Sequence, residues 1–351
     1  MTFKYNNVYV TECATVAGPY EKDGPLGNKF DKTYNDLYIG EKSFESAEVR
    51  LMEESIELLL KKSKKIIKDI DLIVAGDLLN QICASCYATK KFNIPMLGIY
   101  SACSTSTEGI LIASNFIDSN KIKNAIVSSS SHNLSSERQF RNPVEYGAPK
   151  PDTATFTTTG GASILLSNVK SKIKVDSATV GRIRDMGVND ANNMGAVMAV
   201  AAGDTIYEHL KDTRRDVNYY DLIITGDLGV YGSEILKEYM MTEYGIELSN
   251  NYKDSGMMIY NLEKQKQVLA GGSGVACSPL VNYSYTIPLM KKNILSKVLI
   301  VATGALFSPT FVYQKNPILS ISHAISLESV RWLIYTHSYL LDLFQWLDKL
   351  Y

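Results

Sequence analysis

The sequence lacks the features that mark several classes of protein. Its 351 residues carry a formal net charge of −1, which gives no electrostatic basis for a DNA or RNA partner. No stretch reaches the ~18 consecutive apolar residues that a membrane span requires. Residues 1–7 do not have the pattern of a signal peptide. These absences predict a soluble, globular protein of the cytosol, with no nucleic-acid partner and no transmembrane span.

Cysteines and cofactor motifs are also scarce. Five cysteines in a chain of this size predict free thiols in a reducing compartment rather than a disulfide framework. Cys83 and Cys86 form a C-x-x-C pair, but no second Cys or His pair completes a zinc site, so we interpret them as structural or incidental. The glycine-rich segment 271–274 lacks the spacing of a nucleotide-binding loop. We therefore expect neither a metal nor a cofactor.

The chain has only four histidines, which shortens the list of candidate acid–base groups. His132 follows a predicted strand, where ligands of α/β sheets usually bind, and is predicted to be a pocket residue. His209 lies in a charged helical stretch and is predicted to face solvent. His323 is predicted to lie either at the rim of the pocket or in a buried, hydrogen-bonded position. His337 falls in the C-terminal segment.

Cys103 stands where an apolar run gives way to a helical pattern. Residues 94–99 are short and hydrophobic, as in a buried strand, and residues 110–117 are apolar or small, as in a covered helix. A cysteine before a helix faces unpaired N–H groups and the positive end of the helix dipole, which favour a thiolate or a bound anion. A small buried filler is the alternative. The Ser-Ala-Cys-Ser-Thr-Ser cluster favours a functional site, with Cys103 as a nucleophile or as part of an anion site.

A repeat organises the chain. The octamer Asp-Leu-Ile-Val-Ala-Gly-Asp-Leu at 71–78 returns as Asp-Leu-Ile-Ile-Thr-Gly-Asp-Leu at 221–228, and a charged helical stretch precedes each copy. Ala-Cys-Ser stands before a predicted helix in both copies, and a predicted strand follows each helix. The pattern predicts an α/β fold of two pseudo-equivalent halves with mixed sheets and buried central helices. The expected parts are residues 1–170, 171–328 and a C-terminal segment 329–351.

This duplicated pattern, with a cysteine at the start of the first buried helix, resembles the thiolase fold of thiolases and ketoacyl synthases. Within that superfamily, residues 9–328 resemble the stage V sporulation protein AD family. The motifs that carry this resemblance lie at 17–27, 30–34, 75–81, 102–106, 131–133, 137–141, 150–155, 270–274 and 302–306.

The resemblance implies a protein that binds dipicolinic acid (pyridine-2,6-dicarboxylic acid), as the free acid or as its calcium chelate. It implies a role in moving this compound into the developing spore, beside the SpoVA membrane proteins encoded with it. The expected location is the cytoplasmic face of the spore inner membrane, with peripheral attachment. A homodimer is consistent with the resemblance.

The sequence has only part of the set of catalytic residues that thiolases and ketoacyl synthases use. Condensing enzymes need a thiolate and a His/Asn or His/Cys pair that handles the second acyl group. The Gly-His-Pro and Cys-x-Gly strings of thiolases do not occur, and Asp227 takes the place of the ketoacyl synthase histidine. An ionised aspartate only accepts hydrogen bonds. The pattern predicts a binding protein on an enzyme scaffold; the alternative is an acyltransferase or 3-oxoacyl synthase with Cys103 as nucleophile and His132 or His323 as base.

A polar segment after His132 supplies cations for a dicarboxylate. Arg138 and Arg141 are predicted to reach the ligand because guanidinium groups pair carboxylates bidentately. Bracing of the loop on backbone carbonyls is the alternative for both. The predicted ligand-binding residues are Cys103, Ser130, His132, Arg138, Arg141 and Asp227.

The C-terminal segment lies beyond the resemblance. It contains both tryptophans, Trp332 and Trp346, and its apolar residues recur at helical spacing. Such an aromatic amphipathic helix can pack on its own protein, on a partner or in a membrane interface. Packing on the protein is the expectation, and the role of the segment is left open.

Overall fold

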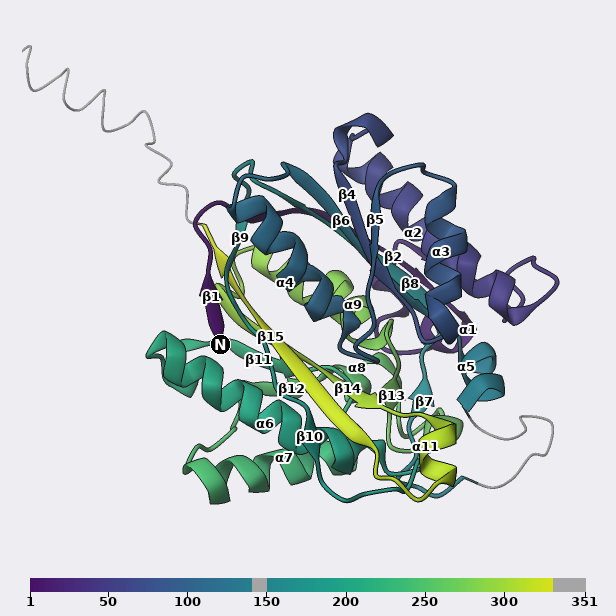
Figure 1. Cartoon of the computed structure of the whole chain (residues 1–351), viewed down its shortest axis with the longest axis vertical. Helices are drawn as coiled ribbons and strands as arrows, with labels where there is room; N and C mark the ends of the chain where they lie inside the picture. The colour runs from purple at the N-terminus through teal and green to yellow at the C-terminus, as the bar shows by residue number, and fades with distance from the viewer. Residues whose placement is uncertain (141–149, 331–351) are drawn as a thin grey trace, which may run out of the picture.

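The computed structural model describes residues 1–140 and 150–330 (Figure 1). The predicted ligand residue Arg141 and the segment 331–351 lie outside the described residues. The described chain forms a 13-stranded mixed sheet whose main path runs β12-β11-β14-β15-β9-β2-β8-β6-β4-β5. These strands are β2 (Tyr9–Ala17), β4 (Leu72–Gly76), β5 (Met96–Gly98), β6 (Asn124–Ser131), β8 (Gly160–Ser167), β9 (Ile173–Thr179), β11 (Leu222–Thr225), β12 (Tyr252–Asp254), β14 (Lys297–Leu306) and β15 (Leu319–Ser329).

The two ends of this path have the same topology. In the first half, β2, β8 and β6 are antiparallel neighbours, and β6, β4 and β5 are parallel neighbours. In the second half, β9, β15 and β14 repeat the antiparallel part, and β14, β11 and β12 repeat the parallel part. The halves join where β2 pairs with β9. The octamer repeat marks equivalent strands, β4 and β11, so the predicted duplicated fold is confirmed.

Helices cover the sheet in three layers (Figure 1). In the first half, α2 (Phe44–Ser63) packs on β2, β6 and β8 and carries α3 (Cys83–Lys90) beside it. In the second half, α6 (Met194–Thr213) packs on β14 and β15 beside α7 (Gly229–Tyr244). Between them lie α4 (Thr105–Asp118) and α9 (Cys277–Val281); α4 contacts β4 and β6 of its own half and β14 and β15 of the other. The predicted buried central helices are thus present, and α4 touches both halves.

The termini of the outer helices follow from local chemistry. Ser43 precedes α2, and its side chain accepts a hydrogen bond from the backbone N–H of Ser46, as an N-cap residue does. Lys64 and Arg214 end α2 and α6 in the left-handed conformation, and each N–H returns to a carbonyl of the last turn. Both helices end in the same way, which supports the duplication at the level of single residues.

One strand differs from the sequence-based prediction. The apolar run 94–99 predicts a buried strand, but β5 is the edge strand of the sheet and Leu97 is 39% exposed. The prediction is wrong because a short apolar run has the same pattern in a buried strand as in an edge strand.

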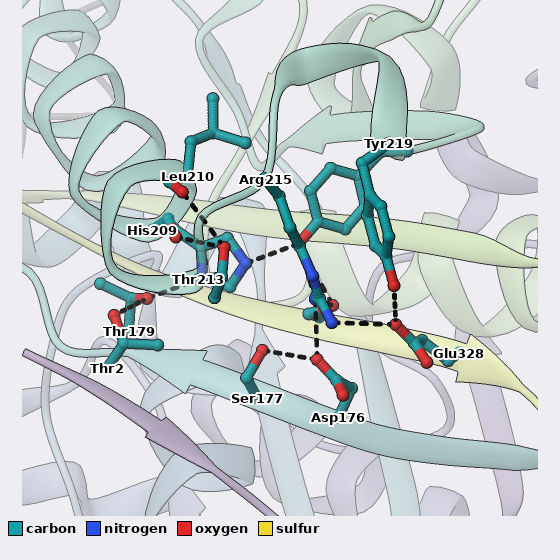
Figure 2. Close-up of polar contacts among 12 residues, drawn as sticks. Thr2, Asp176, Ser177, Thr179, His209, Leu210, Thr213, Arg215, Tyr219 and Glu328 are labelled. Carbon is teal, nitrogen blue, oxygen red and sulfur yellow. Dashed lines mark hydrogen bonds and ion pairs between the residues drawn. The ribbon is translucent and has the colours of Figure 1, made fainter.

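His209 also differs from its prediction, because it is fully buried rather than solvent-facing. The ring nitrogens lie 2.7 Å from Thr179 Oγ1 and 2.7 Å from the Tyr220 hydroxyl (Figure 2). Arg215 continues this network, with ion pairs of 2.8 Å to Asp176 and 3.2 Å to Glu328. These contacts connect the C-terminal end of α6 to β9 and β15. A helix covered on most sides buries even its polar residues, and the local sequence pattern does not reveal this.

Burial lowers the pKa of His209 to about 4, so the folded state resists its protonation. The unfolded chain takes up this proton at about pH 6.5, so stability should be lost as the pH falls from 6.5 towards 4. Between pH 6.5 and 5, this residue should contribute a loss of about 1.5 kcal/mol in the free energy of unfolding.

Denaturant unfolding at several pH values measures this loss. His209→Gln should reduce the pH slope, whereas Lys211→Gln on the same helix should not. An unchanged slope in the His209 variant would contradict the assignment.

Candidate functional site

The turn before α4 places Cys103. Ala102 has a φ of +45°, a left-handed conformation that is strained for a residue with a Cβ. Hydrogen bonds hold this turn: the N–H of Ser104 donates to the Ser101 carbonyl at 3.0 Å, and the Thr105 hydroxyl donates to the Ala102 carbonyl at 2.6 Å. The predicted sequence of strand, sharp turn and covered helix around Cys103 is confirmed.

A small cavity of about 50 Å³ opens on Cys103. Three aromatic rings, those of Tyr100, Phe140 and Phe307, line it, and the last two have centroids 5.9 Å apart. These rings also line an adjoining open groove of about 510 Å³. The other lining residues are Leu78, Ala102, Ser136, Glu137, Thr157, Met194, Ser273, Gly274 and Ala305. Both halves of the chain therefore build the site.

Asp227, which the resemblance places where ketoacyl synthases carry a histidine, lies close enough to Cys103 for its charge to act on the thiol. The residue follows β11 and is buried. One carboxylate oxygen accepts from the Thr303 hydroxyl at 2.6 Å; the other accepts from the N–H of Gly274 at 3.3 Å. Burial raises the pKa of Asp227 to about 7, and the charge of nearby Asp254 adds to the shift.

The thiol of Cys103 is held in its neutral form. Burial raises its pKa well above the ordinary value, and the Asp227 carboxylate disfavours the thiolate further. The expectation that the start of α4 favours a thiolate here is wrong, because burial and the neighbouring carboxyl outweigh the helix terminus. The N–H groups of Ser104 and Thr105 are also already bonded within the turn.

Asp254 contributes to the raised pKa of Asp227. Its carboxylate accepts from the N–H groups of Leu228 and Gly229, both at 3.0 Å, and from the Thr225 hydroxyl at 2.7 Å. It also caps α8 (Ser255–Ile259). The loop of the second repeat is thus fixed by a buried carboxylate that does not line the cavity.

Ser130 and His132 do not join Cys103. The Ser130 hydroxyl points to Glu48 of α2 at 3.5 Å, and His132 Nε2 lies 2.7 Å from the Leu37 carbonyl and stacks on Phe44. Burial lowers the pKa of His132 to about 4, so the ring is neutral. The predicted mouth of Cys103, Ser130 and His132 is therefore not formed.

The side chain of the neighbouring serine contacts the glycine-rich loop of the second half, although it does not line the cavity. Ser131 accepts from the N–H of Ala276 at 3.2 Å and donates to the Thr158 carbonyl at 2.7 Å. Successive side chains of a strand point to opposite faces, so Ser130 and Ser131 cannot share one. An alternation argument on β6 could have found this difference.

Arg138 lies on the exposed side of α5 (Asn133–Phe140). Its guanidinium pairs with Glu45 at 3.2 Å and lies over the Phe44 ring. Arg138 does not line the cavity, and these side-chain contacts to α2 are not the backbone carbonyl contacts of the bracing alternative. In the same region, Lys150 pairs with Glu137 at 2.7 Å.

His323 takes the buried alternative. Its Nδ1 accepts from the N–H of Gly181 at 3.2 Å, and its Nε2 lies 3.3 Å from the Ser101 hydroxyl. Burial lowers its pKa to about 4. It lies against the turn that carries Cys103, and it is not among the residues that line the cavity.

Sequence reasoning missed the contribution of the glycine loop in the second half. Gly274 has a φ of +97°, and a Cβ there would lie 3.0 Å from the Ser131 hydroxyl. Only glycine suits both the conformation and this close approach. The signal was the run Gly-Gly-Ser-Gly at 271–274, which indicates such a turn once it is not required to bind a nucleotide.

Two absences concern the described residues alone. Within residues 1–140 and 150–330, no three side chains of His, Cys, Asp or Glu are grouped as metal ligands. None of the helices in the described part of the chain has the length and apolar character needed to cross a membrane.

Comparison with known proteins agrees with this geometry. Solved structures with the same fold include a single-site variant of OleA from Xanthomonas campestris, with a TM-score of 0.59, 12% identity, and coverage of 93% of this chain and 99% of that one. The 3-oxoacyl-[acyl-carrier-protein] synthase III of Aquifex aeolicus has a TM-score of 0.57 at 13% identity, with coverage of 92% and 99%. At these identities the likeness shows the fold alone, which is that of thiolase-like condensing enzymes.

The sequence comparisons are more specific. Residues 1–328 match the family model of stage V sporulation protein AD (SpoVAD). The stage V sporulation protein AD of Bacillus subtilis is 46% identical over 321 residues, which cover 92% of this chain and 94% of that protein. This chain therefore belongs to the stage V sporulation protein AD family, a family of sporulation proteins with a thiolase-like fold.

Proposed function

We propose that this chain binds dipicolinate at the Cys103 site and takes part in its uptake into the developing spore. The observation that carries the proposal is the aromatic-lined cavity on Cys103, whose thiol lies near a buried carboxyl group, Asp227, at the place where the resemblance puts the histidine of a ketoacyl synthase. Cys103 stands where condensing enzymes carry their nucleophile, but a carboxyl group stands near it in place of the imidazole. Function then follows from this site rather than from the fold.

The electrostatics oppose condensation. A nucleophilic thiol needs a lowered pKa or an adjacent base, and the pKa of Cys103 is raised. None of the described residues that line the cavity is a histidine. His132 and His323, the candidate bases, are both committed to hydrogen bonds outside the cavity. The acyltransferase alternative therefore lacks a histidine base among the described residues that line the cavity.

The lining suits a planar aromatic acid. The rings of Tyr100, Phe140 and Phe307 offer faces and edges against which a pyridine ring can stack. The cavity of about 50 Å³ takes one carboxylate group, and the ring lies between it and the open groove. The start of α4 directs the positive end of its dipole to this carboxylate.

The hydroxyl group of Ser136 lines the cavity. Ser136 is 3% exposed, and within the described structure its Oγ has no hydrogen-bond partner. An unsatisfied buried hydroxyl is costly unless something outside the protein bonds to it. A ligand carboxylate in the cavity accepts this hydrogen bond, and the Cys103 thiol, which also lines the cavity, is a further donor.

The location and partners remain those implied by the family. We propose that the protein acts at the cytoplasmic face of the spore inner membrane, in peripheral contact with the SpoVA membrane proteins. Dipicolinate enters as the free anion or as its calcium chelate, which brings less negative charge into a cavity that Glu137 lines. Calorimetry with and without calcium distinguishes these two ligands.

The first test concerns chemistry. Purified protein should neither condense nor cleave short acyl-CoA thioesters, because the Cys103 thiol is neutral and no described histidine lines its cavity. Turnover is followed by release of free CoA, with Cys103→Ala as the control. Cys103-dependent turnover at about one per second or faster, an ordinary enzymatic rate, would overturn the proposal.

The second test concerns the hydroxyl. Ser136→Ala should weaken dipicolinate binding about tenfold, because a hydrogen bond to a charged group is lost. Ser135→Ala is the matched control: the Ser135 hydroxyl donates to Glu48 at 2.6 Å, away from the cavity, so Kd should not change. Calorimetry measures both. Equal effects of the two substitutions would remove Ser136 from the site.

The third test concerns pH. Since the pKa of Asp227 is raised to about 7, the residue is neutral below this pH and charged above it. Binding of an anion should weaken as the pH rises, by roughly tenfold to thirtyfold in Kd between pH 6 and 8.5. Asp227→Asn should bind with little dependence on pH, whereas Glu21→Gln, another buried carboxyl with its pKa raised to about 7, should keep the wild-type profile. A pH-dependent Asp227→Asn variant would refute the role of this residue.

A further inference from the structure

The turn that carries Cys103 belongs to the first half, but the second half presses against it. At Gly304 of β14, an added Cβ would lie 2.4 Å from the Ser101 carbonyl oxygen and 3.1 Å from the Ser104 hydroxyl. The backbone of β14 therefore approaches the turn as closely as a glycine allows. His323 of β15, the neighbouring strand, makes the polar contact beside it.

The hydroxyl groups of the turn fix the direction of that contact. The Ser104 hydroxyl donates its one hydrogen to the Ser101 carbonyl at 2.6 Å. The two hydroxyls lie 2.7 Å apart, so the Ser101 hydroxyl must be the donor to Ser104. With its hydrogen used there, the Ser101 hydroxyl can only accept from His323 Nε2, at 3.3 Å.

The other ring nitrogen agrees with this assignment. His323 Nδ1 accepts from the N–H of Gly181 at 3.2 Å, so it carries no hydrogen. The ring is then neutral, with its hydrogen on Nε2, which is the tautomer that Ser101 requires. Two independent contacts assign the same tautomer.

We propose that His323 is a positioning residue that holds the strained Cys103 turn from the other half of the chain. Its Nε2–H fixes Ser101, Ser101 fixes Ser104, and these two residues flank Ala102 and Cys103. The thiol is thereby kept near Asp227, which the second half also supplies. The inference rests on the proposed function, because it concerns the same site.

This role differs from that of a catalytic base. The ring does not line the cavity, and both nitrogens are engaged with protein groups. The left-handed conformation of Ala102 is strained and persists only where the surrounding structure enforces it. The contact from His323 to Ser101 supplies part of that enforcement. Loss of the contact to Ser101 should let the turn relax and expose the sulfur atom.

Two substitutions separate the two nitrogens of the ring. In His323→Gln, the amide nitrogen can take the place of Nε2 and keep the hydrogen bond to Ser101. In His323→Asn, the amide oxygen can take the place of Nδ1 and keep the bond from Gly181, but the contact to Ser101 is lost. A general loss of packing should be larger for the shorter side chain, so the melting temperature and the Ser101→Ala variant separate it from loss of the hydrogen bond.

The readout is the rate at which iodoacetamide alkylates Cys103 in the full chain, resolved by peptide mass spectrometry, with the melting temperature as a control. His323→Asn should alkylate about fivefold faster than wild type, as the loss of one hydrogen bond implies, and His323→Gln at about the wild-type rate. Ser101→Ala should match His323→Asn, and the double variant should be no faster than either single one.

Equal rates in the Asn and Gln variants would overturn the proposal. If His323→Asn does not fold, Ser101→Ala decides, because it removes the acceptor and leaves the ring in place; a wild-type rate in that variant also overturns the proposal. The alkylation needs no dipicolinate, so a protein that fails to bind dipicolinate refutes the proposed function while this test still stands.

Discussion

The effect of the Asp227 carboxylate on the Cys103 thiol is the interaction on which this site depends. Both groups are withdrawn from water, and the charge of the carboxylate disfavours the thiolate. An imidazole at the position of Asp227 would stabilise a thiolate, but a carboxylate opposes it. The same scaffold that presents a nucleophile in condensing enzymes therefore presents a neutral thiol here.

The duplicated fold makes this interaction possible. Cys103 precedes the central helix of the first half, and Asp227 follows a strand of the second, so the site exists only where the halves meet. The remaining supports have the same origin: Gly274, Gly304 and His323 all come from the second half and close on a turn of the first. A change in how the halves pack would alter the site before it altered either half.

Much of this arrangement could be predicted from the sequence. The octamer repeat indicated the duplication, and β4 and β11 occupy equivalent places in the sheet. This prediction succeeded because it used order along the chain, which the fold preserves. The resemblance to ketoacyl synthases placed Asp227 at their histidine position, and in the structure its charge acts on the Cys103 thiol.

The failed predictions concern the direction and burial of single side chains. In β6 the residues from Ser128 to Ser131 are all serine and all buried, so their polarity did not show on which face of the sheet each side chain lies. His209 was misplaced because its helix is buried on most sides. The thiolate expected at Cys103 depended on the helix terminus alone, since neither the burial of the thiol nor the distance to Asp227 is visible in one sequence.

The number of protons taken up when dipicolinate binds tests whether Asp227 must be neutral in the complex. Calorimetric titrations at pH 8, in buffers that differ in ionisation enthalpy, give this number. A carboxyl group that must be neutral beside a bound anion, but is mostly ionised in the free protein at this pH, should take up close to one proton per ligand. Uptake of about one proton in the wild type and none in Asp227→Asn is the predicted result. Binding without proton uptake, or equal uptake in the two proteins, would contradict the account.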